Sequence, residues 1–233
     1  MEAFVAAATG LTGRFVVEAL CEARINVTAH VRPDSPRLTK WAKHFSAVGA
    51  RVDTTPWEAD ALQARFAEDS PDLAFALLGT TKKRIKNASD GDYMAVDYGM
   101  TAMLIDALEA GGRTRFVYLS SLGTKAGATS AYMKARWLAE EHLRQSGLPH
   151  LIARPSFILG ERDEPRTFEA LGSGLLDTVL GTAGFFGAKT LARRYGSIQG
   201  RELGYALVRE SLDWRSDSRI VHSDDLRSVP GAG

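Results

Sequence analysis

Apolar and polar positions follow two different rhythms along the chain. Short apolar runs have the length and composition of buried strands, at residues 3–8, 26–31, 51–54, 73–78, 116–119 and 151–153. Between them, apolar residues recur every three or four positions, which predicts helices over 13–23, 38–48, from 56 onward, 93–110 and 131–146. Strands that alternate with helices in this way predict an α/β fold with a Rossmann-like, doubly wound parallel sheet.

After residue 154 this regular pattern stops. Proline, glycine and irregular apolar segments follow, until a helix is predicted over 202–212 and a final strand over 219–222. We therefore expect one compact unit, with residues 1–155 forming the sheet domain. Residues 156–233 would form a small C-terminal lid that covers a substrate, and several large apolar side chains there suggest a pocket lining: Phe168, Leu171, Leu175, Phe185 and Phe186.

Composition narrows the class of protein. The chain has 233 residues, 45% apolar and 24% charged, which are ordinary globular values. A net charge of +1 argues against a nucleic-acid partner. Cys21, the single cysteine, excludes an internal disulfide and indicates a reducing, cytoplasmic setting. Residues 170–187 are apolar but contain Asp177 and five glycines, so no membrane span is expected, and the histidines are not spaced as metal ligands.

Residues 7–13, Ala-Ala-Thr-Gly-Leu-Thr-Gly, join the first strand to the first helix; we call them the glycine turn. Gly10 lets the backbone approach a pyrophosphate, and Gly13 lets the helix pack close to the strand. The amides at the helix N-terminus attract an anion. Ala7 replaces the usual first glycine and would be strained if its φ were positive. A strand–turn–helix without a ligand is the alternative. The candidate cofactor-binding residues of the turn are Ala7, Thr9, Gly10, Leu11, Thr12 and Gly13.

Arg32 lies nineteen residues after Gly13, at the end of the second predicted strand. NAD-binding sheets carry an acidic residue near this position, which binds the ribose diol. An arginine suits the 2′-phosphate of NADP instead, through a charge-assisted pair. We therefore expect NADP (NADPH), with NAD less favoured and a solvated surface arginine as the alternative.

The fifth strand ends in LSSLG, and Tyr132 begins the next helix eleven residues after Ser121. With ATGLTG and ARPSFILGER, these motifs resemble the short-chain dehydrogenase/reductase superfamily over about the first 165 residues. LLGTTKKR, LSSLGTKAG and IVHSDDLR are most similar to its atypical members around the Tat-interacting protein family and bacterial NAD(P)H-binding relatives.

The resemblance implies roles for three residues. Tyr132 would be the general acid/base and Ser121 the serine that orients the substrate oxygen, with Ser120 as the second choice. The family lysine, which binds the nicotinamide ribose, is replaced by Arg136, and Lys134 cannot substitute because a two-residue step turns its side chain ~200° away. A helix-capping tyrosine beside a solvated arginine is the alternative. The family's relay asparagine would fall near Asp97, so no such relay is expected.

Other strand ends complete the expected site. Gly79, Thr80 and Thr81 follow the fourth strand and should pass near the cofactor, and Pro155, Ser156 and Phe157 should close over the nicotinamide. A basic run directly after Thr81 is expected to be a solvated loop, with a member that could reach a phosphate as the alternative: Lys82, Lys83, Arg84 and Lys86.

The function expected from these residues is an NADP(H)-dependent oxidoreductase, a carbonyl or quinone-type reductase acting on a small-molecule substrate. Ala7 and Arg136 motivate a second hypothesis, a non-catalytic NADP(H)-binding regulator or redox sensor. A nucleotide-sugar epimerase or dehydratase is a third, although only about 75 residues follow Arg154 to form its substrate domain. A homodimer is compatible with the pattern.

Overall fold

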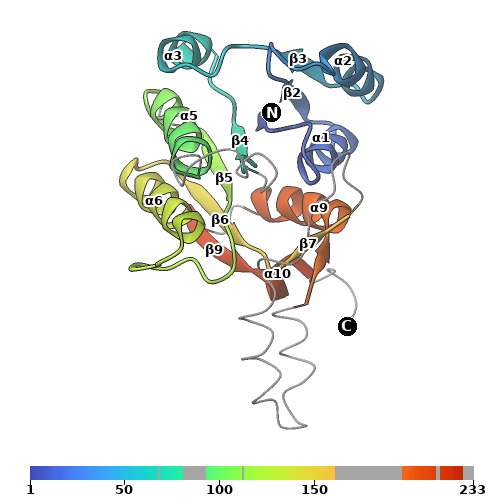
Figure 1. Ribbon diagram of the computed structural model, residues 1–233. Helices are drawn as coiled ribbons and strands as arrows, with labels where there is room; N and C mark the ends of the chain where they lie inside the picture. The colour runs from blue at the N-terminus through green and yellow to red at the C-terminus, as the bar shows by residue number, and fades with distance from the viewer. Residues whose placement is uncertain (68, 81–92, 112, 161–195, 214–215, 228–233) are drawn as a thin grey trace.

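The computed structural model describes residues 1–67, 69–80, 93–111, 113–160, 196–213 and 216–227. Its centre is a seven-stranded parallel sheet in the order β3-β2-β1-β4-β5-β6-β9 (Figure 1). The strands are β1 (Glu2–Ala6), β2 (Asn26–His30), β3 (Arg51–Asp53), β4 (Leu73–Ala76), β5 (Arg115–Leu119), β6 (His150–Arg154) and β9 (Ser218–His222). The strand order reverses between β1 and β4, which confirms the predicted Rossmann-like sheet.

Helices cover both faces of this sheet (Figure 1). One face packs against α1 (Gly13–Glu22), α2 (Leu38–Ala47) and α9 (Gly200–Ser211). The other packs against α3 (Ala59–Ala67), α5 (Met100–Glu109) and α6 (Ala131–Gln145). The alternation within β1 shows the pattern, because Val5 belongs to the first cluster and Phe4 to the second. Apolar residues fill both faces, as the uninterrupted apolar strands predicted.

The C-terminal part of the chain contributes to the same core. α9 lies against α1, and β9 adds a strand beside β6 that is followed by α10 (Ser223–Arg227). A separate two-stranded sheet pairs β7 (Ile158–Leu159) with β8 (Ile198–Gln199). Residues 161–195 of the expected lid, which include all five of its predicted pocket-lining residues, lie outside the described residues.

Several element boundaries differ from the sequence prediction, and three of the differences have a clear backbone feature. The helix expected over 93–110 is divided into a π-helix, η1 (Tyr93–Gly99), and α5. The first strand ends at Ala6, because Ala7 has φ of +56° and leaves the extended conformation. The third helix begins at Ala59, after Pro56 accepts a turn hydrogen bond from the amide of Glu58 at 2.9 Å.

Candidate functional site

The glycine turn lies where the strand order reverses, at the carboxyl end of β1. The amide of Gly10 donates to the carbonyl of Ala7 at 2.9 Å and closes the turn. A Cβ on Gly13 would lie 2.3 Å from that same carbonyl oxygen, and a Cβ on Gly10 would lie 3.1 Å from it. The backbone is therefore as tight as a dinucleotide cradle requires. In the first turn of α1 the amides of Arg14 and Phe15 donate to the carbonyls of Gly10 and Thr12, at 3.3 and 3.1 Å, so a phosphate at this end would be attracted chiefly by the helix dipole and by the amides that precede them.

Ala7 has a left-handed backbone, so the strain foreseen for a Cβ at this position is present. Its side chain packs against both apolar clusters of the sheet. This packing offsets part of the cost of the positive φ.

The side chain of Leu11 anchors the glycine turn to the C-terminal part of the chain. A Cβ on Gly160, after β7, would lie 2.8 Å from Leu11 Cδ1, and one on Gly200, at the start of α9, 2.8 Å from Leu11 Cγ. One turn later in α9, a Cβ on Gly204 would lie 2.7 Å from the Cβ of Phe15. Glycine at these positions lets α9 pack directly on α1 and on the turn.

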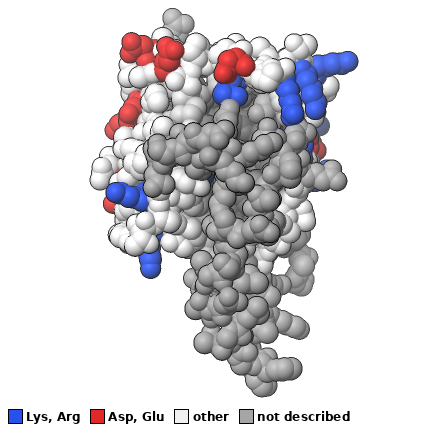
Figure 2. All heavy atoms as spheres, viewed as in Figure 1, with Lys and Arg blue, Asp and Glu red and all other residues white. Residues whose placement is uncertain are grey.

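Arg32 follows β2 and is exposed, with its Nη1 3.5 Å from Asp34 Oδ2. Figure 2 shows Lys and Arg side chains gathered on the surface in the region of α2. The exposed basic residues of the segment that leads into α2 and through it are Arg37, Lys40 and Lys43. The end of β2 thus presents several positive charges to solvent.

The loop after β4 contacts the π-helix. The amide of Thr80 donates to Asp97 Oδ2 at 3.0 Å, and Asp97 is fully buried. Gly79 is exposed, and a Cβ on it would lie 2.8 Å from Nη2 of Arg136. Thr81 and the basic run that follows it lie outside the described residues.

Arg136 is buried and holds the ends of two strands together. Its Nη2 pairs with Asp97 Oδ1 at 2.8 Å and donates to the carbonyl of Leu78 at 3.0 Å, while its Nη1 donates to the carbonyl of Leu119 at 2.7 Å. Nη1 also donates to the hydroxyl of Tyr118 at 3.2 Å. Burial raises the pKa of Tyr118 to about 12, against the opposing charge of Arg136, so this hydroxyl stays neutral. Arg136 is therefore not a solvated base.

Tyr132 lies in the first turn of α6, which begins where the hydroxyl of Ser130 accepts a hydrogen bond from the amide of Met133 at 3.2 Å. The Tyr132 side chain is half-buried, and Arg136 Cζ lies 5.2 Å from its ring centroid. Tyr93 meets the same ring edge-on, with the centroids 5.5 Å apart. Lys134 is exposed, as the helical spacing predicted.

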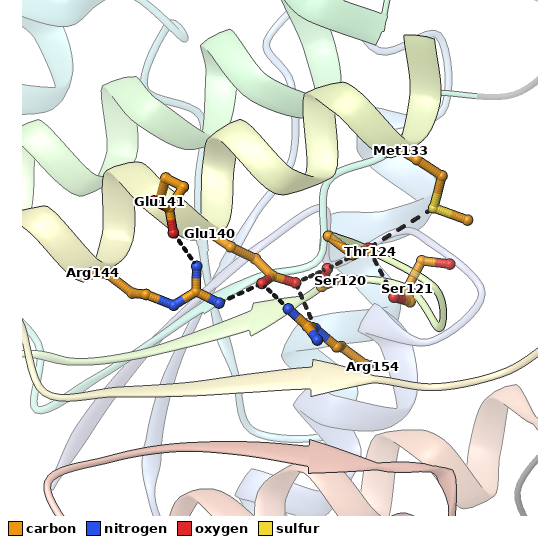
Figure 3. Close-up of polar contacts among 8 residues, drawn as sticks. All are labelled: Ser120, Ser121, Thr124, Met133, Glu140, Glu141, Arg144 and Arg154. Carbon is orange, nitrogen blue, oxygen red and sulfur yellow. Dashed lines mark hydrogen bonds and ion pairs between the residues drawn. The ribbon is translucent and has the colours of Figure 1, made fainter. Parts of the chain in front are cut away.

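The two serines after β5 have different environments. We call residues 120–124 the serine loop. Ser120 is buried and donates to Glu140 Oε1 at 2.6 Å, so its hydroxyl is engaged beneath the loop (Figure 3). Ser121 is half-buried, and its Oγ lies 3.5 Å from the carbonyl of Leu122, at the limit of a hydrogen bond. Of the two, Ser121 has the more accessible hydroxyl.

The backbone groups of residues 155–157 form hydrogen bonds with neighbouring segments. The carbonyl of Pro155 accepts from the amide of Leu122 at 2.9 Å, and that of Phe157 accepts from Ile198 at 2.8 Å. The amide of Ser156 donates to Ser223 Oγ at 2.9 Å. This segment therefore links the serine loop to the C-terminal elements.

Comparison with known proteins agrees with this geometry. A sequence model of an NAD(P)H-binding family matches residues 7–178, which include the glycine turn, the serine loop and Tyr132. The chain belongs to this NAD(P)H-binding family. This match confirms the expected atypical short-chain dehydrogenase/reductase-like superfamily and a nicotinamide cofactor, without distinguishing NADP from NAD.

Curated relatives of this NAD(P)H-binding protein share about a quarter of its sequence. The mitochondrial protein FMP52 of Candida albicans is 26% identical over 77% of this chain and 75% of its own length. The chloroplastic protein TIC 62 of Arabidopsis thaliana is 29% identical over 76% of this chain and 30% of its own length. These names contradict the cytoplasmic location expected from the single cysteine. The inference failed because organelle interiors can also be reducing, so one free thiol does not identify the compartment.

Solved structures share the fold. UDP-glucuronic acid 4-epimerase from Bacillus cereus has a TM-score of 0.67 and 15% identity, covering 95% of this chain and 76% of that one. The anaerobillin reductase ChuY from Escherichia coli O157:H7 has a TM-score of 0.62 and 17% identity, covering 95% of each chain.

Within the described part of this NAD(P)H-binding chain, no helix is both long and apolar enough to cross a membrane. Over the same residues, no group of three or more His, Cys, Asp or Glu side chains is arranged to hold a metal ion.

Sequence reasoning named Tyr132 and Arg136 but missed Glu140 and Arg144, which continue the same helix face. Tyr132, Arg136, Glu140 and Arg144 follow one another at four-residue intervals and form what we call the α6 stripe. This spacing places them on one helix face and could have indicated a polar face. Glu140 pairs with Arg144 along the stripe, but other partners come from other elements, and no spacing rule connects Glu140 to Ser120 or Arg136 to Asp97.

Proposed function

We propose that the protein is an NADP(H)-dependent oxidoreductase that reduces a small carbonyl- or quinone-type substrate. The observation that carries this proposal is the placement of Tyr132 in the first turn of α6, with the guanidinium of Arg136 5.2 Å from its ring centroid. A half-buried phenol beside a fixed cation, at the carboxyl edge of a cofactor-binding sheet, suits proton transfer to a substrate oxygen.

In this proposal the protein supplies orientation and one proton. The Tyr132 hydroxyl donates its proton to the substrate oxygen as that oxygen gains negative charge, and the Ser121 hydroxyl donates a hydrogen bond to the same oxygen. Arg136 acts as a fixed positive charge beneath Tyr132 and not as a ribose ligand, because protein acceptors engage both its terminal nitrogens. Bound NADPH would supply the hydride.

Cofactor binding is assigned to the strand ends around the point where the strand order reverses. The glycine turn would hold the pyrophosphate, with Gly79, Thr80 and Thr81 along the adenosine side and residues 155–157 near the nicotinamide. The exposed Arg32 and its basic neighbours favour the 2′-phosphate of NADP. The part of residues 156–233 that lies outside the core elements α9 and β9 would cover the substrate.

A second candidate is a non-catalytic NADP(H)-binding regulator. The favouring observation is that Arg136, at the position of the family lysine, is committed to Asp97 and to two strand-end carbonyls. In this candidate, Arg136 holds the strand ends in place and does not contact the cofactor ribose.

Oxidation of NADPH, followed by absorbance across a panel of quinones, aldehydes and ketones, separates the two candidates. For the enzyme we expect Tyr132→Phe to lower kcat by about 10²–10⁴-fold, the usual contribution of a general acid, with the NADPH Kd unchanged within about twofold. Tyr205→Phe is the matched control, because Tyr205 lies on α9 and donates to Glu22. Tight NADPH binding without turnover on any substrate would instead support the regulator.

A binding measurement in the same experiment tests the assignment of NADP rather than NAD. Arg32→Ala should weaken NADPH by about tenfold, as expected for losing ~1.5 kcal/mol of a hydrogen bond to a charged group, and leave NADH unchanged. Tighter binding of NADH than NADPH by the wild-type protein would contradict the role of Arg32.

A further inference from the structure

Glu140 is a fully buried carboxylate whose two oxygens both accept hydrogen bonds. Oε1 accepts from Ser120 Oγ at 2.6 Å and from Arg154 Nε at 2.9 Å. Oε2 accepts from Nη2 of Arg154 and from Nη2 of Arg144 at 2.6 Å (Figure 3). A buried charge is costly unless it is paired and hydrogen-bonded, and Glu140 is both.

The contacts of Glu140 lead to the serine loop. Ser120, which Glu140 binds, also lies 3.3 Å from Thr124 through the two hydroxyl oxygens. Thr124 Oγ1 in turn donates to the carbonyl of Ser121 at 2.8 Å. The hydroxyl protons of Ser120 and Thr124 are already donated to Glu140 and to the carbonyl of Ser121, so Glu140 reaches Ser121 through Ser120, its neighbour in the chain, while Thr124 closes the loop beside it.

The same carboxylate ties the serine loop to the end of β6. Arg154, the last residue of β6, binds Glu140 through two nitrogens. The backbone adds parallel links, because the amide of Ser120 donates to Ala153 at 2.8 Å and that of Leu122 to Pro155 at 2.9 Å. Glu140 is therefore the side-chain junction of β5, β6 and α6.

Tyr132 stands two helical turns before Glu140 on the same helix. The helix that carries the proposed proton donor therefore also anchors the loop that carries Ser121. A rigid helix transmits one fixed geometry to both groups, and catalysis is sensitive to displacements of about 1 Å between reacting groups.

We infer that Glu140 is a positioning residue, which holds the serine loop so that Ser121 keeps a fixed place relative to Tyr132. This inference rests on the proposed function for its catalytic consequence. Its structural core, the rigidity of residues 120–124, can be measured without turnover.

Three single variants test the inference: Glu140→Gln, Ser120→Ala and the control Glu141→Gln. A glutamine at 140 keeps the shape but turns an NH₂ group toward an arginine. Alanine at 120 removes only the hydroxyl that Glu140 binds. Glu141 is the adjacent residue on α6 and pairs with Arg144 from a partly exposed position, so its substitution changes charge without touching Ser120.

Hydrogen–deuterium exchange in the full chain gives the first readout. We expect Glu140→Gln and Ser120→Ala to raise amide exchange in the serine loop by at least tenfold, while β1 amides and NADPH affinity stay within about twofold of wild type. Glu141→Gln should leave the loop amides unchanged. If Glu140→Gln does not fold, Ser120→Ala alone decides the inference. Unchanged exchange in the loop of Ser120→Ala, or an equal rise in β1, would overturn the inference.

Steady-state kinetics give the second readout. We expect both variants to lower kcat by about tenfold with the KM for NADPH unchanged. The double variant should be no slower than the slower single variant, because both substitutions break the same link. Multiplicative losses in the double variant would show that Glu140 does not act through Ser120. Absence of wild-type turnover would count against the proposed function alone, since the exchange measurement still decides the positioning role.

Discussion

The glycine turn and the α6 stripe belong to the same proposed site but are stabilised in opposite ways. The turn is built from small residues whose backbone atoms approach closely, with Gly13 fitting against the carbonyl of Ala7. The α6 stripe carries long charged side chains, and the two most buried of them, Arg136 and Glu140, are at most 6% exposed.

The difference between them teaches where binding specificity for an anion can arise. The backbone amides of the glycine turn are uncharged groups at the positive end of the α1 helix dipole, and this location suits an incoming phosphate. The charges of the α6 stripe are already matched by protein partners such as Asp97 and Arg154. The turn is therefore where we propose that a ligand binds, whereas the stripe fixes the strand ends beside it.

Different kinds of substitution should destabilise the two regions. Added volume disturbs the glycine turn, because there is no room for another atom. Lost charge disturbs the α6 stripe, because the partner that remains is a buried ion without compensation.

The largest effect is expected from breaking the buried pair of the α6 stripe. Arg136→Met leaves the carboxylate of Asp97 buried without its cation, and the free energy of unfolding should fall by about 3–5 kcal/mol. Urea unfolding followed by circular dichroism measures the loss. Arg51→Met is the matched control, because Arg51 pairs with Glu2 at the surface, where such a pair contributes at most ~1 kcal/mol.

The double variant Arg136→Met with Asp97→Leu sharpens this test. Removing both charges should restore much of the lost stability, since a buried ion pair contributes little beyond satisfying its own members. If the double variant is less stable than the single one, the hydrogen bond that Asp97 accepts from the amide of Thr80 matters more than the relief of its unpaired charge.

Most of the fold was predictable from the sequence, for a local physical reason. Apolar runs and helical periodicity record burial directly, so the sheet, its flanking helices and the late strand at 218–222 were recognisable. The division of 93–110 into a π-helix and α5 was not, because a π-turn changes the apolar spacing by a single residue.

The part of the candidate site that backbone atoms form, the glycine turn, was predictable from the sequence. Glycine at positions 10 and 13 is required by close approach at fixed offsets, so spacing alone identified the turn. Apart from Arg144 on the same helix, the partners of Arg136 and Glu140 come from other elements, at separations of 14 to 58 residues. Such contacts depend on how helices are placed on the sheet, which periodicity does not encode.

A second prediction tests the lack of room in the glycine turn. Gly13→Ala places a Cβ 2.3 Å from the carbonyl oxygen of Ala7, so the turn must open. Overpacking of this kind costs about 1–3 kcal/mol of stability, and NADPH affinity should fall with it. Gly10→Ala is the graded comparison, because its Cβ would lie 3.1 Å from the same oxygen and should cost less. Wild-type stability and NADPH affinity for Gly13→Ala would show that the turn is not closely packed.

The smallest effect is expected from Ala7→Gly, which removes a Cβ that strains the turn. Ala7 has φ of +56°, which costs a residue with a Cβ about 1–2 kcal/mol, whereas glycine adds about 0.5–1 kcal/mol of unfolded-state entropy. Ala7→Gly also loses packing against both apolar clusters, so the net gain in stability should stay below about 1 kcal/mol. Arg24→Gly is the control, because Arg24 has φ of +59° at an exposed position and should gain stability without that loss. Thermal unfolding of both variants measures the difference. A net loss for Ala7→Gly beside a gain for Arg24→Gly would mean that side-chain packing, and not only backbone approach, shapes the glycine turn.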